Sequence, residues 1–288
     1  METEQLGFGW MGMLDKARPW VGSRVTHQPA PQTYFVSHVP YELTESIDEF
    51  KLKDDVYGIY YPLVQMMGTN MRKVPDYEIR DLLKNQGKWT GAYQNGLDGL
   101  SFFNTAHPVD FYDAAKGTYV NDFRSGGQTI NGILTGGALA PNAYATLWQE
   151  FASRRSETNE ALGVIPKLTV VPPQLNITAM TILHAQFYAP GSLGNLTSQV
   201  GSTENMLKGS TDLLMVPEFA ADPTNWYMFD TTRAVKPISW CLRSAADFTY
   251  RINPQDPVVF DTHTYTMGSK MQFVPAWSHA WLAAVSGP

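Results

Sequence analysis

The chain has 288 residues, with 27 acidic and 21 basic side chains, a formal net charge of −6 and only 17% charged residues. Strong nucleic-acid binders need clustered lysine and arginine, and the densest basic cluster here is Arg154–Arg155, so such a function is disfavoured. The single cysteine, Cys241, excludes an internal disulfide bond, and no run of about 18 apolar residues predicts a membrane span.

Residues 1–35 follow neither a helical nor a strand period, and three prolines prevent one long helix there. The segment nevertheless carries two tryptophans, Trp10 and Trp20, which should not stay in water. We therefore expect an arm that lies on another surface.

Residues 34–52 have the alternation of an extended strand. Tyr41, Leu43 and Ile47 share one parity, while acidic and polar residues occupy the other. At Phe50 the parity changes, which predicts a bulge, a twist or the end of the strand. We interpret the segment as a long, acidic, protruding ribbon rather than a core strand.

The period becomes helical between Tyr57 and Asn85, where a broad apolar stripe includes three methionines. We expect this stripe to pack in a core or an interface rather than against a cofactor. Pro62 suits the first turn of the helix. Pro75 lies in the middle of the run and is expected to kink or split the helix.

The glycine-rich stretch 125–142 lacks the lysine of a phosphate-binding loop, so we expect a flexible loop. Pro141 then opens a predicted amphipathic helix. Its apolar face consists of Tyr144, Leu147, Trp148, Phe151 and Ala152. Arg154 and Arg155 complement the helix dipole at its C-terminal end.

The second half of the chain is richer in short strands. A buried strand is predicted at 168–171, then a helix over 177–187, then a Gly-, Ser- and Thr-rich segment, 189–212, that we expect to be mobile. Further strands are predicted at 213–219, 226–229, 237–242, 248–252, 258–260 and 271–274. Because helices and strands do not alternate regularly, the predicted fold class is mixed α+β.

The sequence contains no recognised catalytic or metal-binding motif. Asp261 and His263 could offer two metal ligands, but no third ligand lies nearby, so an accidental arrangement is favoured. Cys241 lies in an apolar run and is predicted to be a buried, inert thiol. His107, in GLSFFNTAHP, has no recognisable partner. Catalytic residues often converge from distant segments, so this pattern leaves both a catalytic base and a scaffold residue open.

Six segments share their sequence and their order with a known family. They are GWMGMLDKARPWVGSR, YELTESI with DDVYGIYYPLVQMMG, PDYEIRDLL, LDGLSFFNTAHPVD, LTVVPPQL, and LLMVPEF with WYMFDTTRAVKPISWCLR. On these segments the chain resembles the major head subunit family of Mu-like tailed bacteriophages. The segments cover nearly the whole chain except 111–140 and 188–210.

The resemblance implies a Hong Kong 97-like capsid fold. Its parts would be an N-terminal arm (1–33), an E-loop (34–56), a peripheral domain with a long spine helix (57–135), an axial domain (136–232) and closing strands of the peripheral domain (233–288). His107 would then lie in a turn of the peripheral domain and have a structural role.

The resemblance also implies a function, which is self-assembly into the icosahedral shell that encloses phage DNA. Such a protein is not an enzyme and has no catalytic, cofactor-binding or metal-binding residue. An arm and a ribbon cannot bury their apolar faces within one subunit, so neighbouring copies in hexamers and pentamers would cover them. The expected interface residues are Trp10, Trp20, Arg24, Tyr34, Phe35, Tyr41, Leu43, Ile47 and Phe50.

The same resemblance implies partners and a location. A portal, a scaffold or a protease would take part in assembly, packaged DNA would be contacted only weakly and non-specifically, and no membrane would be involved. The protein would be assembled in the bacterial cytoplasm and reside in the virion.

Two other functions compete with this one. An encapsulin-type compartment would keep the fold and load a protein cargo; neighbouring portal, terminase and protease genes would favour the phage shell instead. A soluble hydrolase would use His107 or His263 in a cleft. A His107→Ala variant of a hydrolase would stay folded but lose turnover, whereas a shell protein would assemble unchanged or show a folding defect.

Overall fold

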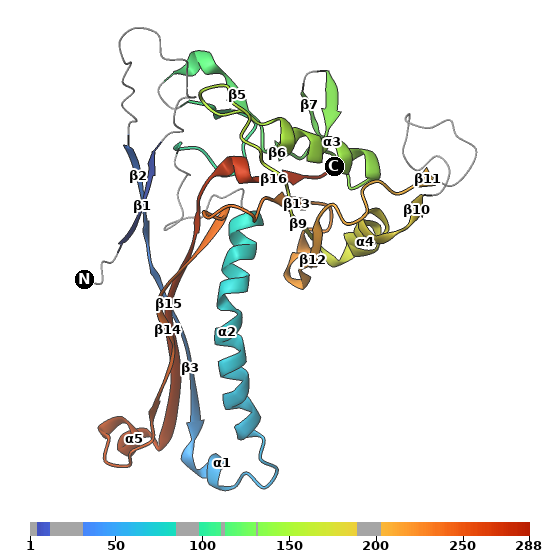
Figure 1. Cartoon of the computed structure of the whole chain (residues 1–288). Helices are drawn as coiled ribbons and strands as arrows, with labels where there is room; N and C mark the ends of the chain where they lie inside the picture. Colours follow the sequence, from blue (N-terminus) through green and yellow to red (C-terminus); the bar gives the residue numbers. More distant parts are fainter. Residues whose placement is uncertain (1–4, 12–30, 85–97, 111–112, 131, 189–202) are drawn as a thin grey trace.

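The structure, a computed structural model, describes residues 5–11, 31–84, 98–110, 113–130, 132–188 and 203–288. A broad body of short strands and helices carries an elongated limb, which is formed by one long helix and long strands (Figure 1). The architecture is mixed α+β, as the order of elements predicted.

The body is built on a five-stranded sheet with the order β12-β9-β13-β16-β6. The strands are β12 (Asp212–Met215), β9 (Leu168–Val171), β13 (Trp226–Phe229), β16 (Ala283–Ser286) and β6 (Asp122–Phe123). β13 runs antiparallel to β9 and β16, while β12 is parallel to β9 and β6 is parallel to β16. β6 and β16 therefore belong to the body sheet, whereas the predicted division placed both in the peripheral domain.

Both faces of the body sheet are covered, and β13 shows this most directly because all four of its residues are buried. Trp226 and Met228 belong to the cluster formed with α3 (Pro141–Ser153) and α4 (Asn176–His184). Tyr227 and Phe229 point the other way, into the cluster that contains the end of the long helix. Alternation with a period of two is what an extended strand imposes. A strand covered on both faces therefore needs the continuous apolar run WYMF.

The limb consists of a three-stranded antiparallel sheet with the long helix α2 beside it. The sheet has the order β14-β15-β3, with β14 (Ile238–Arg251), β15 (Thr264–Trp277) and β3 (Val39–Asp48). Met71 of α2 packs against Met271 and Phe273 of β15, so this methionine fills a core inside the subunit. The strands predicted at 237–242 and 248–252 are one strand, β14, with two register shifts between 242 and 247.

Helix α2 spans Tyr60–Lys84 and passes through Pro75. Its first turn is capped by Asp55, whose carboxylate accepts hydrogen bonds from the amides of Ile59 (3.1 Å) and Tyr60 (3.2 Å). Pro75 does not split the helix, contrary to one of the predicted outcomes. The proline ring is buried, so packing offsets the loss of one main-chain hydrogen bond.

Strands β1 (Gln5–Met11) and β2 (Pro31–Ser37) form a separate antiparallel hairpin, in which Gln5 lies opposite Ser37 and Met11 opposite Pro31. The predicted boundary between arm and E-loop, at residue 33, falls inside β2. The hairpin therefore joins the predicted arm to residues 34–37 of the predicted E-loop, while residues 39–48 form β3 in the limb.

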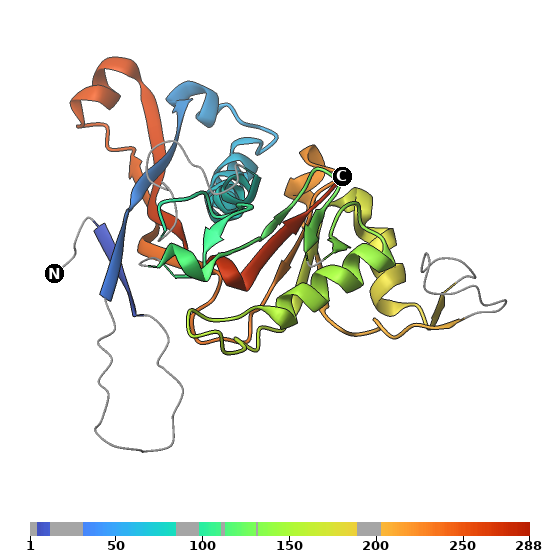
Figure 2. The ribbon, with the colours of Figure 1, turned by 90° about the horizontal axis from the view of Figure 1, so that it is seen from above.

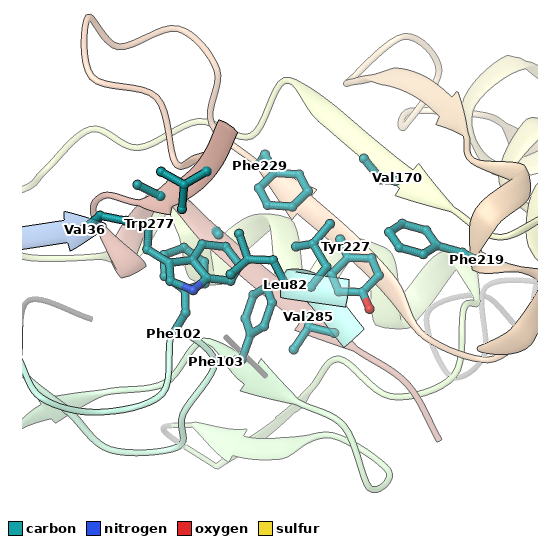
Figure 3. Close-up of a cluster of buried hydrophobic side chains, with 14 of the residues drawn as sticks. Val36, Leu82, Phe102, Phe103, Val170, Phe219, Tyr227, Phe229, Trp277 and Val285 are labelled. Carbon is teal, nitrogen blue, oxygen red and sulfur yellow. The ribbon is translucent and has the colours of Figure 1, made fainter. Parts of the chain in front are cut away.

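One cluster joins the limb, the hairpin and the body (Figure 3). It contains Val36 of β2, Leu82 of α2, Phe102, Trp277 of β15 and Val285 of β16. The rings of Phe102 and Trp277 stack with centroids 3.6 Å apart. Each large apolar side chain buried there contributes about 1.5–3 kcal/mol. Figure 2 looks along α2 and shows this helix on one side of β16 and α3 on the other.

Three local predictions are wrong. The strand predicted at 258–260 is the helix α5 (Pro257–Thr262), because Asp256 caps it by accepting from the amide of Val258 at 3.0 Å. The glycine-rich stretch 125–142 contains a hairpin of β7 (Gln128–Ile130) and β8 (Ile133–Thr135). The strand predicted at 213–219 ends early, where Pro217 opens a 3₁₀ turn.

The remaining elements are short. They are α1 (Glu49–Lys53), the pair β4 (His107–Pro108) and β5 (Thr118–Tyr119), the pair β10 (Phe187–Tyr188) and β11 (Thr203–Glu204), and 3₁₀ turns at Ala114–Lys116, Pro173–Leu175, Pro217–Ala221 and Ala280–Leu282. Residues 189–202 of the segment expected to be mobile lie outside the described residues. The strand at 168–171, the strand at 226–229 and the helix opened by Pro141 are confirmed.

Candidate assembly surfaces

The far end of the limb exposes an unusual concentration of apolar side chains. There α1 and α5 meet, because the amide of Glu49 donates to the carbonyl of His263 at 2.8 Å (Figure 1). The group that we name the limb tip consists of Phe50, Val56, Tyr57, Ile59, Tyr61, Tyr250 and Phe260. Val56 is 88% exposed and Tyr57 is 91% exposed. Large exposed apolar groups of this kind mark interaction surfaces.

A second exposed apolar point is the β7–β8 hairpin on the body. Ile133 and Leu134 are more than half exposed, at 55% and 58%. Ile130 on the adjoining strand packs against the cluster of α3 and α4, which fixes the hairpin on that face of the sheet.

A groove lies between the C-terminal half of α2 and the edge strand β12, and we name it the α2–β12 groove. Its volume is about 630 Å³. Apolar side chains line it, including Ile79, Leu83, Val170, Phe219 and Phe229. The charged residues that border it are Asp76, Arg80, Glu218 and Lys236.

His107 is buried and has the partner that the sequence did not reveal. Its Nδ1 bonds the carboxylate of Asp98, and its Nε2 lies 3.0 Å from the carbonyl of Phe102. The imidazole also stacks on the ring of Tyr119, with centroids 5.2 Å apart. Because both ring nitrogens are engaged inside the fold, neither is available to a substrate. The geometry therefore favours a scaffold residue.

The two other candidate chemical groups are the buried thiol of Cys241 and the more exposed imidazole of His263. Cys241 is buried, and desolvation raises the pKa of its thiol to about 11, which keeps it protonated and inert at neutral pH. His263 ends α5 in a left-handed conformation and pairs with Glu49 at 3.7 Å. Within the described part of the chain, no three His, Cys, Asp or Glu side chains are grouped so that they could hold a metal ion. Among the described helices, none has both the length and the apolarity to cross a membrane.

Comparison with known proteins decides the family. The family model described as "Mu-like prophage major head subunit gpT" matches residues 1–134 and 215–285. The chain belongs to this family.

Two curated relatives match part of the chain. The chain is 35% identical over 116 residues to the major capsid protein of Escherichia phage Mu. The matched region covers 40% of this chain and 36% of that protein. The chain is also 26% identical over 102 residues to the Mu-like prophage FluMu major head subunit of Haemophilus influenzae. This match covers 35% of this chain and 32% of that protein. These matches thus span about a third of the length of either relative.

The fold of the chain is similar to that of a phage capsid protein. The capsid structure of bacteriophage JBD30, decorated with minor capsid protein trimers, superposes with a TM-score of 0.57 at 19% identity. The superposition covers 76% of this chain and 86% of that one. The prediction of a Hong Kong 97-like fold is confirmed.

The structure exposes two of the predicted interface side chains, Phe35 (61%) and Phe50 (59%). Trp20 and Arg24 lie outside the described residues, as does the side chain of Trp10.

Four predicted interface residues pack against other parts of the same chain. Ile47 is 4% exposed, and Tyr41 and Leu43 pack against the methionine cluster between α2 and β15. Tyr34 packs against the central cluster, where burial raises its pKa to about 12. In the subunit alone, β15 and α2 bury Ile47 and cover Tyr41 and Leu43 in part, so much of this apolar face is covered without another copy.

Sequence reasoning missed most of the limb tip. Val56 and Tyr57 precede the first turn of α2 and have no place in its apolar stripe. The sequence signal for an exposed apolar surface here is a pair of apolar residues that lie just before the helix and fit no helical or strand period.

Proposed function

We propose that this chain is a major capsid protein that self-assembles into the icosahedral shell around phage DNA and so resides in the virion. Family membership and the capsid fold support the proposal. The observation that carries it is the limb tip, because aliphatic and aromatic side chains that are up to nine-tenths exposed need a partner surface. Other copies of the chain supply that surface.

The proposal includes the division of the subunit. The limb, with α2 and the β14-β15-β3 sheet, corresponds to the peripheral domain, and the body sheet with α3 and α4 corresponds to the axial domain. The β1–β2 hairpin combines the predicted arm with residues 34–37 of the predicted E-loop, whereas residues 39–48 of that segment form β3 of the limb. This assignment follows from which strands share a sheet.

The proposal also covers chemistry and partners. The subunit is not an enzyme and needs no cofactor, and the double engagement of His107 supports this against a hydrolase. A portal, a scaffold or a protease acts with it during assembly. With a net charge of −6, the chain contacts packaged DNA only weakly. No observation favours cargo loading in an encapsulin-type compartment over a phage shell.

Tyr57→Ser tests the proposal, with Tyr57→Phe as the matched control. The serine variant removes an aromatic ring that is almost fully exposed in the subunit, so the subunit keeps its melting temperature while assembly weakens. The phenylalanine variant keeps the ring and assembles. Light scattering and negative-stain electron microscopy measure particle formation. A wild-type chain that stays monomeric at every concentration, or a serine variant that assembles like the wild type, contradicts the proposal.

A further inference from the structure

We propose that neighbouring copies bind head to tail, with the β7–β8 hairpin of one copy seated in the α2–β12 groove of the next. This inference rests on the proposed function and assigns two surfaces to one contact between subunits.

The inserting element is short and apolar at its tip. Ile130 and Ile133 pair across the hairpin, and Gly132 adopts a positive φ of 81° between them. Ile133 and Leu134 then stand more than half exposed, although the other strand of the hairpin is anchored against the α3 and α4 cluster. The hairpin is therefore a fixed projection whose apolar end has no cover in the subunit.

The receiving surface combines an apolar floor with a free strand edge. Among the described residues, β12 pairs only with β9, so the main-chain groups on its other edge are open to a new strand. Leu214 and Met215 on this strand are 47% and 40% exposed. The groove volume of about 630 Å³ lies within the roughly 300–1,000 Å³ that proteins use to enclose a ligand.

The lack of charge on the hairpin is compatible with the apolar floor of the groove. Residues 128–135, QTINGILT, carry no charged side chain, so inserting them brings no charge into an apolar site. The charges that border the groove are of both signs, and Arg80 already pairs with Asp81 at 2.7 Å. An uncharged apolar tip thus fits the groove better than a basic or an acidic segment does.

The two surfaces lie on opposite sides of the body sheet. Helices α3 and α2 lie on opposite sides of β16 (Figure 2). The hairpin packs on the cluster of α3, whereas α2 lines the groove. A contact between different surfaces of identical subunits is heterologous, and repeating it closes a ring when the rotation permits. The capsomers of a shell need this kind of contact.

Cysteine pairing tests the contact without disturbing the fold. Leu134→Cys and Met215→Cys are placed on separate copies in a Cys241→Ala background, which puts no hydroxyl into the central cluster, and the copies are mixed under assembly conditions and oxidised with diamide. We expect a disulfide-linked heterodimer from the mixture and at least tenfold less from either variant alone. Ile177→Cys, a 78% exposed position on α4, replaces Met215→Cys in the control mixture and should not form the link.

Disruption provides the second measurement. Leu134→Asp should abolish particles while leaving the melting temperature unchanged, and Leu134→Met should restore them. If the wild type forms shells but Leu134→Cys and Met215→Cys do not link, the contact is wrong and the proposed function stands. If the wild type forms no particles, the proposed function fails as well.

Discussion

Gly136→Ala should lower the free energy of unfolding by about 2–5 kcal/mol, because Gly136 combines a positive φ with a complete lack of space. The residue has φ of 79° and lies where β8 passes β6 and β16. An added Cβ would lie 2.5 Å from Cβ of Phe123 and 2.7 Å from Oγ of Ser286.

The magnitude has two parts. A non-glycine residue in the left-handed region costs about 1–2 kcal/mol. Overpacking a filled core costs about 1–3 kcal/mol more, and both contacted residues are completely buried. Ser286 cannot move aside freely, because its hydroxyl donates to the carbonyl of Gly137 at 2.9 Å and accepts from the Gly137 amide at 2.7 Å.

Urea unfolding of the unassembled subunit measures the loss, and Gly126→Ala is the matched control. Gly126 has φ of 87°, but an added Cβ there meets nothing within 4 Å. The control should therefore lose only about 1–2 kcal/mol. If both variants lose the same stability, the steric argument is refuted, and if Gly136→Ala loses none, the backbone argument fails too.

Three further predictions concern the described subunit. His107→Ala should cost about 3 kcal/mol, because it leaves the Asp98 carboxylate buried without its partner; an unchanged melting temperature would contradict the structural role. Burial lowers the pKa of His279 to about 4, so the unfolded chain protonates first as pH falls. Stability should be full above about pH 6.5 and decline by up to about 3 kcal/mol towards pH 4, and His279→Gln should flatten this decline in melting scans. Deleting residues 1–33 should preserve cooperative unfolding but prevent assembly. Normal particles of this variant in electron microscopy would contradict a role of residues 1–33 in assembly.

Long periodic elements were predictable from sequence because their signal is local. The stripe between Tyr57 and Asn85 becomes α2, and the continuous apolar run at 226–229 becomes a strand buried on both faces. The order of elements indicated the mixed α+β class, but the capsid fold came only from the family resemblance, since no local pattern encodes how two sheets share one core.

The errors arise where distant segments decide the outcome. The alternation at 39–48 cannot say whether its apolar face meets another copy or β15, which lies more than two hundred residues later in the chain. Asp98 is paired with His107 by a turn, and no spacing rule in the sequence links an isolated aspartate to an isolated histidine. At 257–262, valine and phenylalanine favour a strand, but the Asp256 cap and Pro257 at the first position favour the short helix.

The pairing of β3 with β15 also constrains when the subunit can form. Ile47 of β3 lies opposite Tyr265 of β15, and β6 pairs with β16 near the end of the sequence. Neither sheet is therefore complete while the ribosome is still translating the segment before residue 264. A nascent chain therefore lacks both the finished limb and the finished body. Under the proposed function, this topology places assembly after complete translation.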